Sequence, residues 1–339
     1  MQPDLCLLAR TDAMRFFHFK HLRRRRTNNS MNTSTHALAV RLFLTTSLLV
    51  FGTLAALPAR AVDVTLTVTA VAKKGSPPPI KKEDVQVFEG KERVQVADWR
   101  HDGPLYLAIL IDDSLDTEAA SQWSDLKAFI NAQPQNTLVA VAYARNGTAM
   151  IAQDFTQDHA AAAKALRIPL GNLGAFASPY LSLQDWLKRW PSTTGDHRSS
   201  ILLISSGIDY FRGGFDPVDP DLDTTISRAQ KENINIWTIY YPSDGHLSRG
   251  FFRVFNAQSN LSRLSEETGA ESYYLSFDRP VTLKPYFDEL QDHFNNQYLL
   301  TFAAAGGGKK GKFQRVRVIT EVPNVQFLTP SEVFLPPSQ

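Results

Sequence analysis

The chain has 339 residues, of which 43% are hydrophobic and 21% charged, as is ordinary for a globular protein of about two domains. The net charge of +2 is unevenly distributed, because residues 1–61 hold nine of the 36 Lys and Arg residues but only two of the 34 Asp and Glu residues. Residues 62–339 therefore carry a net charge of −5, which argues against nucleic acid as the main partner. The single cysteine, Cys6, excludes a disulfide within residues 62–339.

Residues 31–61 have the pattern of a secretory signal peptide. Arg41 precedes an apolar run over 42–57, and residues 59–61 (ARA) form a small-x-small cleavage site. The run of 16 residues is shorter than the ~20 of a membrane span, which favours a cleaved signal over the alternative, an uncleaved anchor. We therefore expect 1–61 to be a leader, with translation starting at Met31 and cleavage after Ala61. The mature protein is then periplasmic or extracellular and has no membrane attachment.

Residues 62–103 are predicted to be rich in β-strands. Residues 62–71 alternate between apolar and polar side chains, as in a half-buried antiparallel strand. Two short strands, 85–88 and 94–97, are predicted on either side of a turn at 89–91 (EGK).

Residues 104–297 alternate between strand and helix patterns, which predicts a doubly wound, mostly parallel sheet. Asn146 and Gly147 form a strong hairpin signal, which would add one antiparallel edge strand. The strands are predicted over 105–111, 137–144, 149–153, 200–205, 234–241 and 271–276. The helices are predicted over 117–132, 158–167, 179–190, 221–233, 257–268 and 283–297.

The sequence returns to strand patterns after residue 297. Strands predicted over 298–304 and 313–322 flank a glycine-rich segment at 306–312, which we interpret as a hairpin turn, and another strand is predicted over 325–328. Neither chain end has enough strands to be stable alone, so 298–339 should pair with 62–103. The expected fold is α/β: a Rossmann-like sheet flanked by helices and inserted in a small antiparallel β-domain that the two chain ends form.

Acidic and hydroxyl side chains follow the most apolar strand. Seven apolar residues, 105–111, are followed by Asp112, Asp113, Ser114 and Asp116. A short continuous apolar run indicates a strand buried on both faces, and ligands of such sheets bind at the carboxyl ends of the strands. Carboxylate and hydroxyl oxygens in one tight loop suit a hard cation such as Mg²⁺. Loops at 174–179 and 205–209 are expected at the same edge.

This order of strands, helices and polar loops resembles a von Willebrand factor type A (VWA) domain. The flanking segments EDVQVFE, YLLTF and GKFQRVRV make the chain similar to the VWFA-related domain family of secreted acidobacterial proteins, over about residues 62–330. The resemblance implies a metal-ion-dependent adhesion site, which in VWA domains consists of a D-x-S-x-S loop, a threonine in a second loop and an aspartate in a third.

The expected site residues follow from this resemblance position by position. Asp112 and Ser114 match the first aspartate and the first serine of the motif. The other positions depart from it: Asp116 stands in place of a second serine, Ser178 in place of the threonine and Ser206 in place of the third-loop aspartate, with Asp209 three residues further on. The resemblance thus implies a degenerate Mg²⁺ or Mn²⁺ site.

Two non-enzymatic functions are consistent with this sequence. The first is a module for protein–protein interaction or adhesion, in which the cation completes its coordination with an acidic side chain of a protein or peptide partner. The second is a metal-independent structural or scaffolding protein of the same fold, in which the polar side chains of a decayed site cap the next helix.

The sequence supplies no catalytic residue that we can assign. It has no G-x-S-x-G nucleophile motif. An aspartate phosphohydrolase using Asp112 or Asp113 would need a lysine and further acids at other strand ends, whereas serines and residues 240–242 (YYP) follow the later strands. The histidines after residue 61 lack paired spacing, so the sequence predicts no zinc site. They are His101, His159, His197, His246 and His293.

Overall fold

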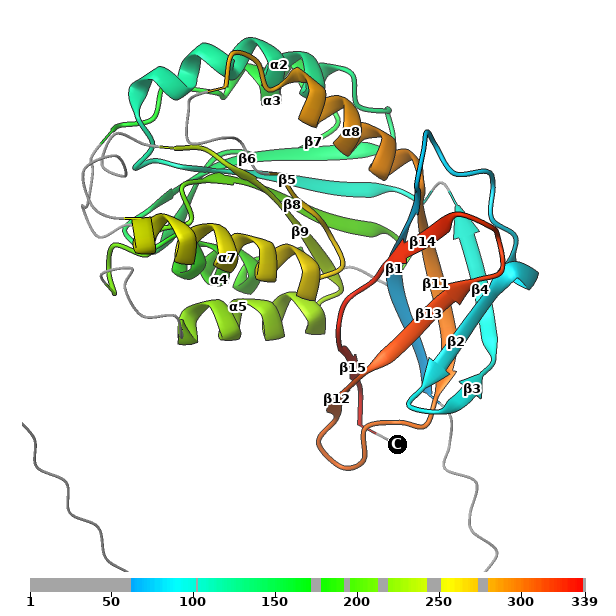
Figure 1. Cartoon of the computed structure of the whole chain (residues 1–339). Coiled ribbons are helices and arrows are strands. Elements are labelled where there is room, and N and C mark those ends of the chain that lie inside the picture. The colour runs from blue at the N-terminus through cyan, green and yellow to red at the C-terminus, as the bar shows by residue number, and fades with distance from the viewer. Residues whose placement is uncertain are drawn as a thin grey trace, which may run out of the picture. The chain divides into compact units, whose positions relative to one another are not determined.

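The computed structural model describes residues 62–101, 103–171, 178–191, 196–212, 219–242, 251–273 and 280–337. These residues belong to one compact unit, in which an α/β part and a smaller β-domain can be distinguished (Figure 1). The first described residue, Val62, begins a strand. The predicted signal peptide lies outside the described residues.

The α/β part contains a six-stranded sheet in the order β10-β9-β8-β5-β6-β7. All neighbours are parallel except β6 and β7, so the predicted doubly wound, mostly parallel sheet is confirmed. If β5 to β10 are numbered 1 to 6 in chain order, the sheet read from β7 to β10 has the order 3-2-1-4-5-6, which is the order of Rossmann-like folds. The bounds are β5 Leu105–Asp112, β6 Thr137–Arg145, β7 Thr148–Thr156, β8 Arg198–Ser205, β9 Ile234–Tyr240 and β10 Ser272–Tyr273.

The predicted hairpin at Asn146 and Gly147 joins β6 to β7. Both residues have positive φ angles, of 50° and 71°, as a type I′ turn requires. Arg145 pairs with Thr148 directly across this turn. The hairpin thus provides the antiparallel edge strand that the sequence predicted.

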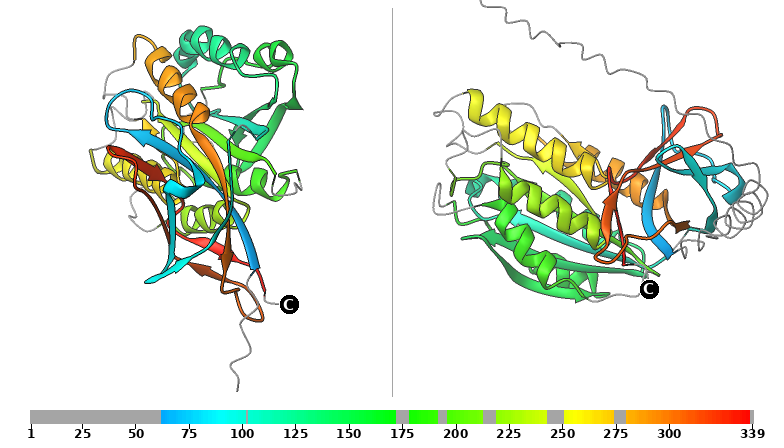
Figure 2. Two further views of the ribbon diagram at one scale, coloured as in Figure 1. Left: turned by 90° about the vertical axis from the view of Figure 1, so that its right-hand side faces the viewer. Right: turned by 90° about the horizontal axis from the view of Figure 1, so that it is seen from below.

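Helices cover both faces of the sheet (Figures 1 and 2). Their bounds are α2 Trp123–Asn131, α3 His159–Lys164, α4 Pro179–Lys188, α5 Pro220–Lys231, α7 Phe251–Glu267 and α8 Lys284–Asn295. All six predicted helices are present, with two differences. The predicted helix over 117–132 begins as a 3-10 helix, η2 (Thr117–Gln122), and α7 begins at Phe251 rather than at residue 257.

Strand β5 separates two hydrophobic clusters because successive side chains point to opposite faces of a sheet. Leu107 and Ile109 belong to the cluster that includes residues of α2, α3 and α8, whereas Ala108 and Leu110 belong to the cluster that includes residues of α4, α5 and α7. Each buried leucine or isoleucine contributes about 1.5–3 kcal/mol relative to an exposed one. Burial on both faces explains the unbroken apolar run in the sequence.

The two chain ends pair with each other, as predicted. Strand β1 lies between β11 and β14 and is antiparallel to both, and β13 pairs with β2. The strands of this β-domain are β1 Val62–Ala72, β2 Val85–Glu89, β3 Glu92–Val94, β4 Val96–His101, β11 Gln297–Ala304, β12 Lys312–Gln314, β13 Val316–Thr320, β14 Val325–Leu328 and β15 Val333–Leu335.

Two details of this β-domain differ from the sequence-based expectation. The glycine-rich segment at 306–312 is not a hairpin turn, because both edges of β11 are occupied by β1 and β4, and β12 pairs with β15 instead. The second half of the polar face of β1 is not exposed to solvent either. Thr67 and Thr69 are fully buried, and the backbone N–H of Thr67 donates to Asn233 Oδ1 of the α/β part at 2.9 Å.

A second junction joins the end of α7 to the C-terminal segment. Thr268 forms an isolated β-bridge with Pro330, and the next residue, Gly269, has a φ of 78°. A Cβ atom on Gly269 would lie 2.6 Å from the backbone nitrogen of Pro330. Only glycine therefore suits this position, both for its backbone conformation and for the close approach of the C-terminal segment.

We predict that Gly269→Ala destabilises the protein more than Gly75→Ala does. Gly75 also has a positive φ, of 64°, but a Cβ atom on Gly75 would have nothing within 4 Å of it. Both variants lose about 1–2 kcal/mol through the left-handed backbone, and Gly269→Ala loses a further 1–3 kcal/mol or so through overpacking. Urea unfolding measures both values, and equal losses would contradict the close contact at Pro330.

Candidate functional site

Asp112 is held in place by hydroxyl groups from two loops. Its Oδ1 accepts hydrogen bonds from Ser114, at 2.9 Å from the backbone nitrogen and at 2.6 Å from Oγ. Its Oδ2 accepts a hydrogen bond from Ser205 Oγ at 2.7 Å. All three side chains are buried. The carboxylate at the end of β5 thus has a fixed position and orientation.

Burial determines the electrostatics of this carboxylate. Loss of solvent raises the pKa of Asp112, the hydrogen bonds from Ser114 and Ser205 lower it, and the nearby charge of Asp113 raises it further. The net direction is upward from the ordinary value of 3.8. The negative form is therefore disfavoured by its surroundings, and a nearby cation would stabilise it.

A second carboxylate–hydroxyl pair joins the other two predicted loops. Ser178 is the N-cap of α4: its Oγ accepts from Leu181 N at 3.3 Å and donates to Asp209 Oδ2 at 2.8 Å. Asp209 also accepts from Arg212 N, at 3.1 Å. Asp209 therefore turns toward Ser178, the position that the sequence alone left open.

Tyr180 is bonded to the third loop. Its hydroxyl group is buried and donates to the carbonyl oxygen of Gly207 at 2.9 Å. Burial raises the pKa of Tyr180 well above its ordinary value, and the negative charges of Asp219, Asp209 and Asp112 raise it further. Asp112 ends β5 and Asp209 follows β8, and these two strands are parallel neighbours, so the two pairs lie at the same carboxyl edge of the sheet.

Two predicted site residues have other surroundings. Ser206 is fully buried, and its Oγ lies 3.5 Å from the backbone nitrogen of Ile208 in its own loop, whereas Ser205 makes the hydrogen bond to Asp112. Asp116 occupies the N-cap position of η2, where its backbone carbonyl accepts from Ala119 N at 2.9 Å. Residues 174–177 of the predicted second loop lie outside the described residues.

Asp113 is engaged by an arginine that sequence reasoning did not identify. Arg167 donates from Nη1 and Nη2 to the two carboxylate oxygens, at 2.7 and 2.9 Å, and its guanidinium group lies 3.7 Å from the ring centroid of Tyr143. Leu170 N also donates to Asp113, at 3.0 Å. Asp113 therefore anchors residues 167–170. Arg167 is 54 residues away in sequence, and no local pattern marks it.

Exposed aromatic side chains lie at the same edge. Phe211 follows the third loop, and Phe252 and Phe255 are in the first turns of α7, which follows the carboxyl end of β9. Their exposed fractions are 60%, 76% and 59%. We call these three residues the aromatic rim. Exposed aromatic side chains beside a polar site are typical of surfaces that bind other proteins.

The donor atoms at this edge suit a hard cation. Asp112 and Asp209 contribute carboxylates, Ser114 and Ser178 contribute hydroxyl groups, and all of these are the oxygen ligands that Mg²⁺ prefers. In the present arrangement the hydroxyl hydrogens are directed at the carboxylates, and they would have to rotate for the serine oxygens to coordinate a cation.

The strand order, the antiparallel edge strand and the polar loops at the carboxyl edge define a VWA-type α/β fold. No protein-family model matches the chain, and a search of curated proteins finds no match. None of the helices in the described part of the chain is both long and apolar enough to span a membrane.

Several solved structures have a similar fold. An aerotolerance-related membrane protein from Bacteroides fragilis is 12% identical, with a TM-score of 0.41, over 56% of this chain and 98% of that one. BatB from Bacteroides thetaiotaomicron is 9% identical, with a TM-score of 0.41, over 56% and 96%. A von Willebrand factor type A protein from Catenulispora acidiphila is 11% identical, with a TM-score of 0.36, over 83% and 74%. These likenesses concern the fold and not the function.

We predict that the stability difference between Asp112→Asn and the wild type depends on pH in the presence of EDTA. Since the pKa of Asp112 is raised in the folded state, its stabilising contribution is complete below about pH 3.8 and is lost as the pH rises through the folded-state pKa. Asparagine does not titrate, so Tm of the variant minus Tm of the wild type should be larger at pH 7 than at pH 4. A difference that is constant or has the opposite slope would contradict the upward shift.

Proposed function

We propose that this protein is an exported VWA-type module that binds a protein or peptide at the carboxyl edge of its sheet, through a degenerate metal-ion-dependent adhesion site. The observation that carries this proposal is the grouping at one edge of the two carboxylate–hydroxyl pairs, Asp112 with Ser114 and Asp209 with Ser178, beside the aromatic rim. Export is proposed from residues 31–61 and predicts Val62 as the first residue of the mature chain.

The chemistry of the edge supports a partner with both acidic and apolar side chains. A bound Mg²⁺ or Mn²⁺ would supply positive charge and an open coordination position for a carboxylate of the partner. The aromatic rim would contact apolar side chains next to that carboxylate. Because two carboxylates and two serines of the expected motif are grouped in the described part of this edge, we expect cation affinity to be low until the partner adds its own ligand.

The geometry supports binding rather than catalysis. Asp113, which could otherwise act as a nucleophile beside Asp112, forms a two-point ion pair with Arg167. Asp112 accepts three hydrogen bonds and is buried. Neither carboxylate has the exposure that attack on a substrate requires.

A metal-independent scaffold of the same fold is the second candidate. The observation that favours it is that the carboxylates of Asp112 and Asp209 already accept hydrogen bonds from serines without a cation. In this function the same bonds hold the three loops together, and the aromatic rim alone contacts a partner.

Cation titration distinguishes the two candidates. The binding-module proposal predicts weak Mg²⁺ or Mn²⁺ binding by calorimetry, loss of that binding in Asp112→Ala, and tighter binding in Ser206→Asp, which supplies the carboxylate that VWA domains have at that position. Asp63→Asn, on an exposed position of β1, is the matched control and should bind as the wild type does. If Ser206→Asp also fails to bind either cation, the scaffold is the better account.

The aromatic rim should determine partner binding. In intact cells, chemical cross-linking of the wild type should give a discrete adduct, and Phe252→Ser combined with Phe255→Ser should reduce its yield roughly tenfold, as loss of about 1.4 kcal/mol of contact would. The control is Ile319→Ser in the β-domain. This variant removes an apolar side chain that is 37% exposed and lies away from the aromatic rim. Equal yields from both variants would show that the partner binds elsewhere.

A further inference from the structure

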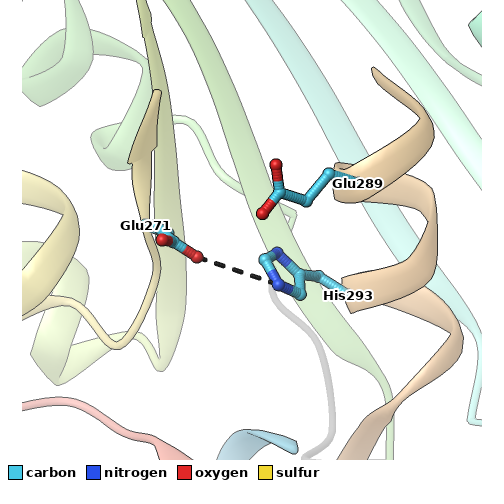
Figure 3. A group of neighbouring side chains, drawn as sticks. All are labelled: Glu271, Glu289 and His293. Carbon is cyan, nitrogen blue, oxygen red and sulfur yellow. Dashed lines mark ion pairs between the residues drawn. The ribbon is translucent and has the colours of Figure 1, made fainter. Parts of the chain in front are cut away.

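Three potential metal ligands meet beside β10, the short strand at one side of the sheet. Glu271 immediately precedes β10, and Glu289 and His293 lie one turn apart on α8. One ligand atom from each lies within 4.8 Å of the other two. Figure 3 shows the two carboxylates and the imidazole ring directed toward one common space. Ser272 pairs with Thr238 in the second half of β9, so Glu271 lies beside the middle of β9, whereas Asp112 is the last residue of β5.

His293 has the orientation of a metal ligand. Its side chain is buried and stacked on Trp237, with ring centroids 5.2 Å apart, and its Nδ1 is hydrogen-bonded to the hydroxyl group of Tyr273 at 2.9 Å. A bond of this kind commonly fixes the ring of a metal-binding histidine. The other ring nitrogen, Nε2, makes no hydrogen bond within the described part of the chain and is directed toward the carboxylate of Glu271 (Figure 3).

The spacing also suits a shared ion better than a direct contact. His293 Nε2 lies 3.8 Å from Glu271 Oε2, which is too long for a hydrogen bond. Two ligands of a tetrahedral Zn²⁺, each about 2.0–2.2 Å from the ion, are about 3.4 Å apart. A small closing movement would therefore bring both atoms to one ion.

The local charge favours a cation. Neither glutamate forms an ion pair with a lysine or arginine among the described residues. Burial raises the pKa of Glu271, and the charge of Glu289 raises it further, while burial lowers the pKa of His293. Asp292 adds another negative charge close to the ring. A neutral imidazole between two carboxylates is the form in which such a group binds a metal.

We propose that Glu271, Glu289 and His293 form a second cation site, of the class that binds Zn²⁺, which clips α8 to the edge strand of the sheet. One nitrogen and two oxygen ligands suit Zn²⁺ better than Mg²⁺, which prefers oxygen alone. A water molecule completes the shell. The cation stabilises the folded state because the three ligands come together only after α8 has packed on β9 and β10.

Zinc titration of the full chain tests this proposal. The wild type should bind one Zn²⁺ at this site, show the absorption of tetrahedral Co²⁺ when Co²⁺ is used instead, and gain thermal stability from Zn²⁺. Glu271→Gln and Glu289→Gln preserve side-chain size and should each weaken this binding at least tenfold and abolish the gain in Tm. Tyr273→Phe, which removes only the hydroxyl group, should weaken it by roughly 10–100-fold.

Two variants serve as controls. Asp288→Asn removes the carboxylate next to Glu289 on α8, where it pairs with Lys284, and should leave zinc binding unchanged. Asp112→Asn should also retain it, which separates this site from the one at the carboxyl edge. Circular dichroism verifies that each variant is folded. The proposal is overturned if the wild type gains no stability from Zn²⁺, or if folded Glu271→Gln and Glu289→Gln bind Zn²⁺ as tightly as the wild type.

Discussion

The fixed position of Asp112 is the constraint on which the proposed binding edge depends. Strand β5 pairs with a parallel strand on each side, and residues 107–111 are fully buried. The carboxylate that ends this strand therefore has little freedom, and its hydrogen bonds to Ser114 and Ser205 draw the first and third loops together. A buried carboxylate in such surroundings is energetically unfavourable unless a cation or several donors compensate for it.

The β-domain leaves this edge free because it contacts the α/β part elsewhere. Thr67 of β1 bonds to Asn233, which precedes β9, and Pro330 pairs with Thr268, which precedes β10. Both contacts are therefore at the amino edge of the parallel sheet, and the aromatic rim is at the opposite one. The amino edge thus carries the structural junctions, and the proposed partner binds at the carboxyl edge. The proposed zinc ion at Glu271 would act between these edges, beside β10.

Most of the fold could be predicted because local patterns report burial. The apolar run of β5, the alternation of β1 and the turn at Asn146 each determine their own element, and pairing of the two chain ends followed from their shortage of strands. What could not be predicted depends on contacts between residues distant in sequence. Ser205, and not the predicted Ser206, donates a hydrogen bond to Asp112. Arg167 binds Asp113 although the two residues are 54 positions apart in the sequence. Likewise His293 has Glu289 one turn before it on α8 but gains Glu271 only through packing of α8 against the sheet.

The central claim is that the three loops at the carboxyl edge form one cation site, and anomalous diffraction from crystals grown with Mn²⁺ tests it most directly. The predicted result is a single anomalous peak at this edge, within coordination distance of Ser114 Oγ and Ser178 Oγ and bridged to Asp112 directly or through water. A map from well-ordered crystals with no peak beside these three residues, even at millimolar Mn²⁺ and with an acidic peptide added, would contradict the claim.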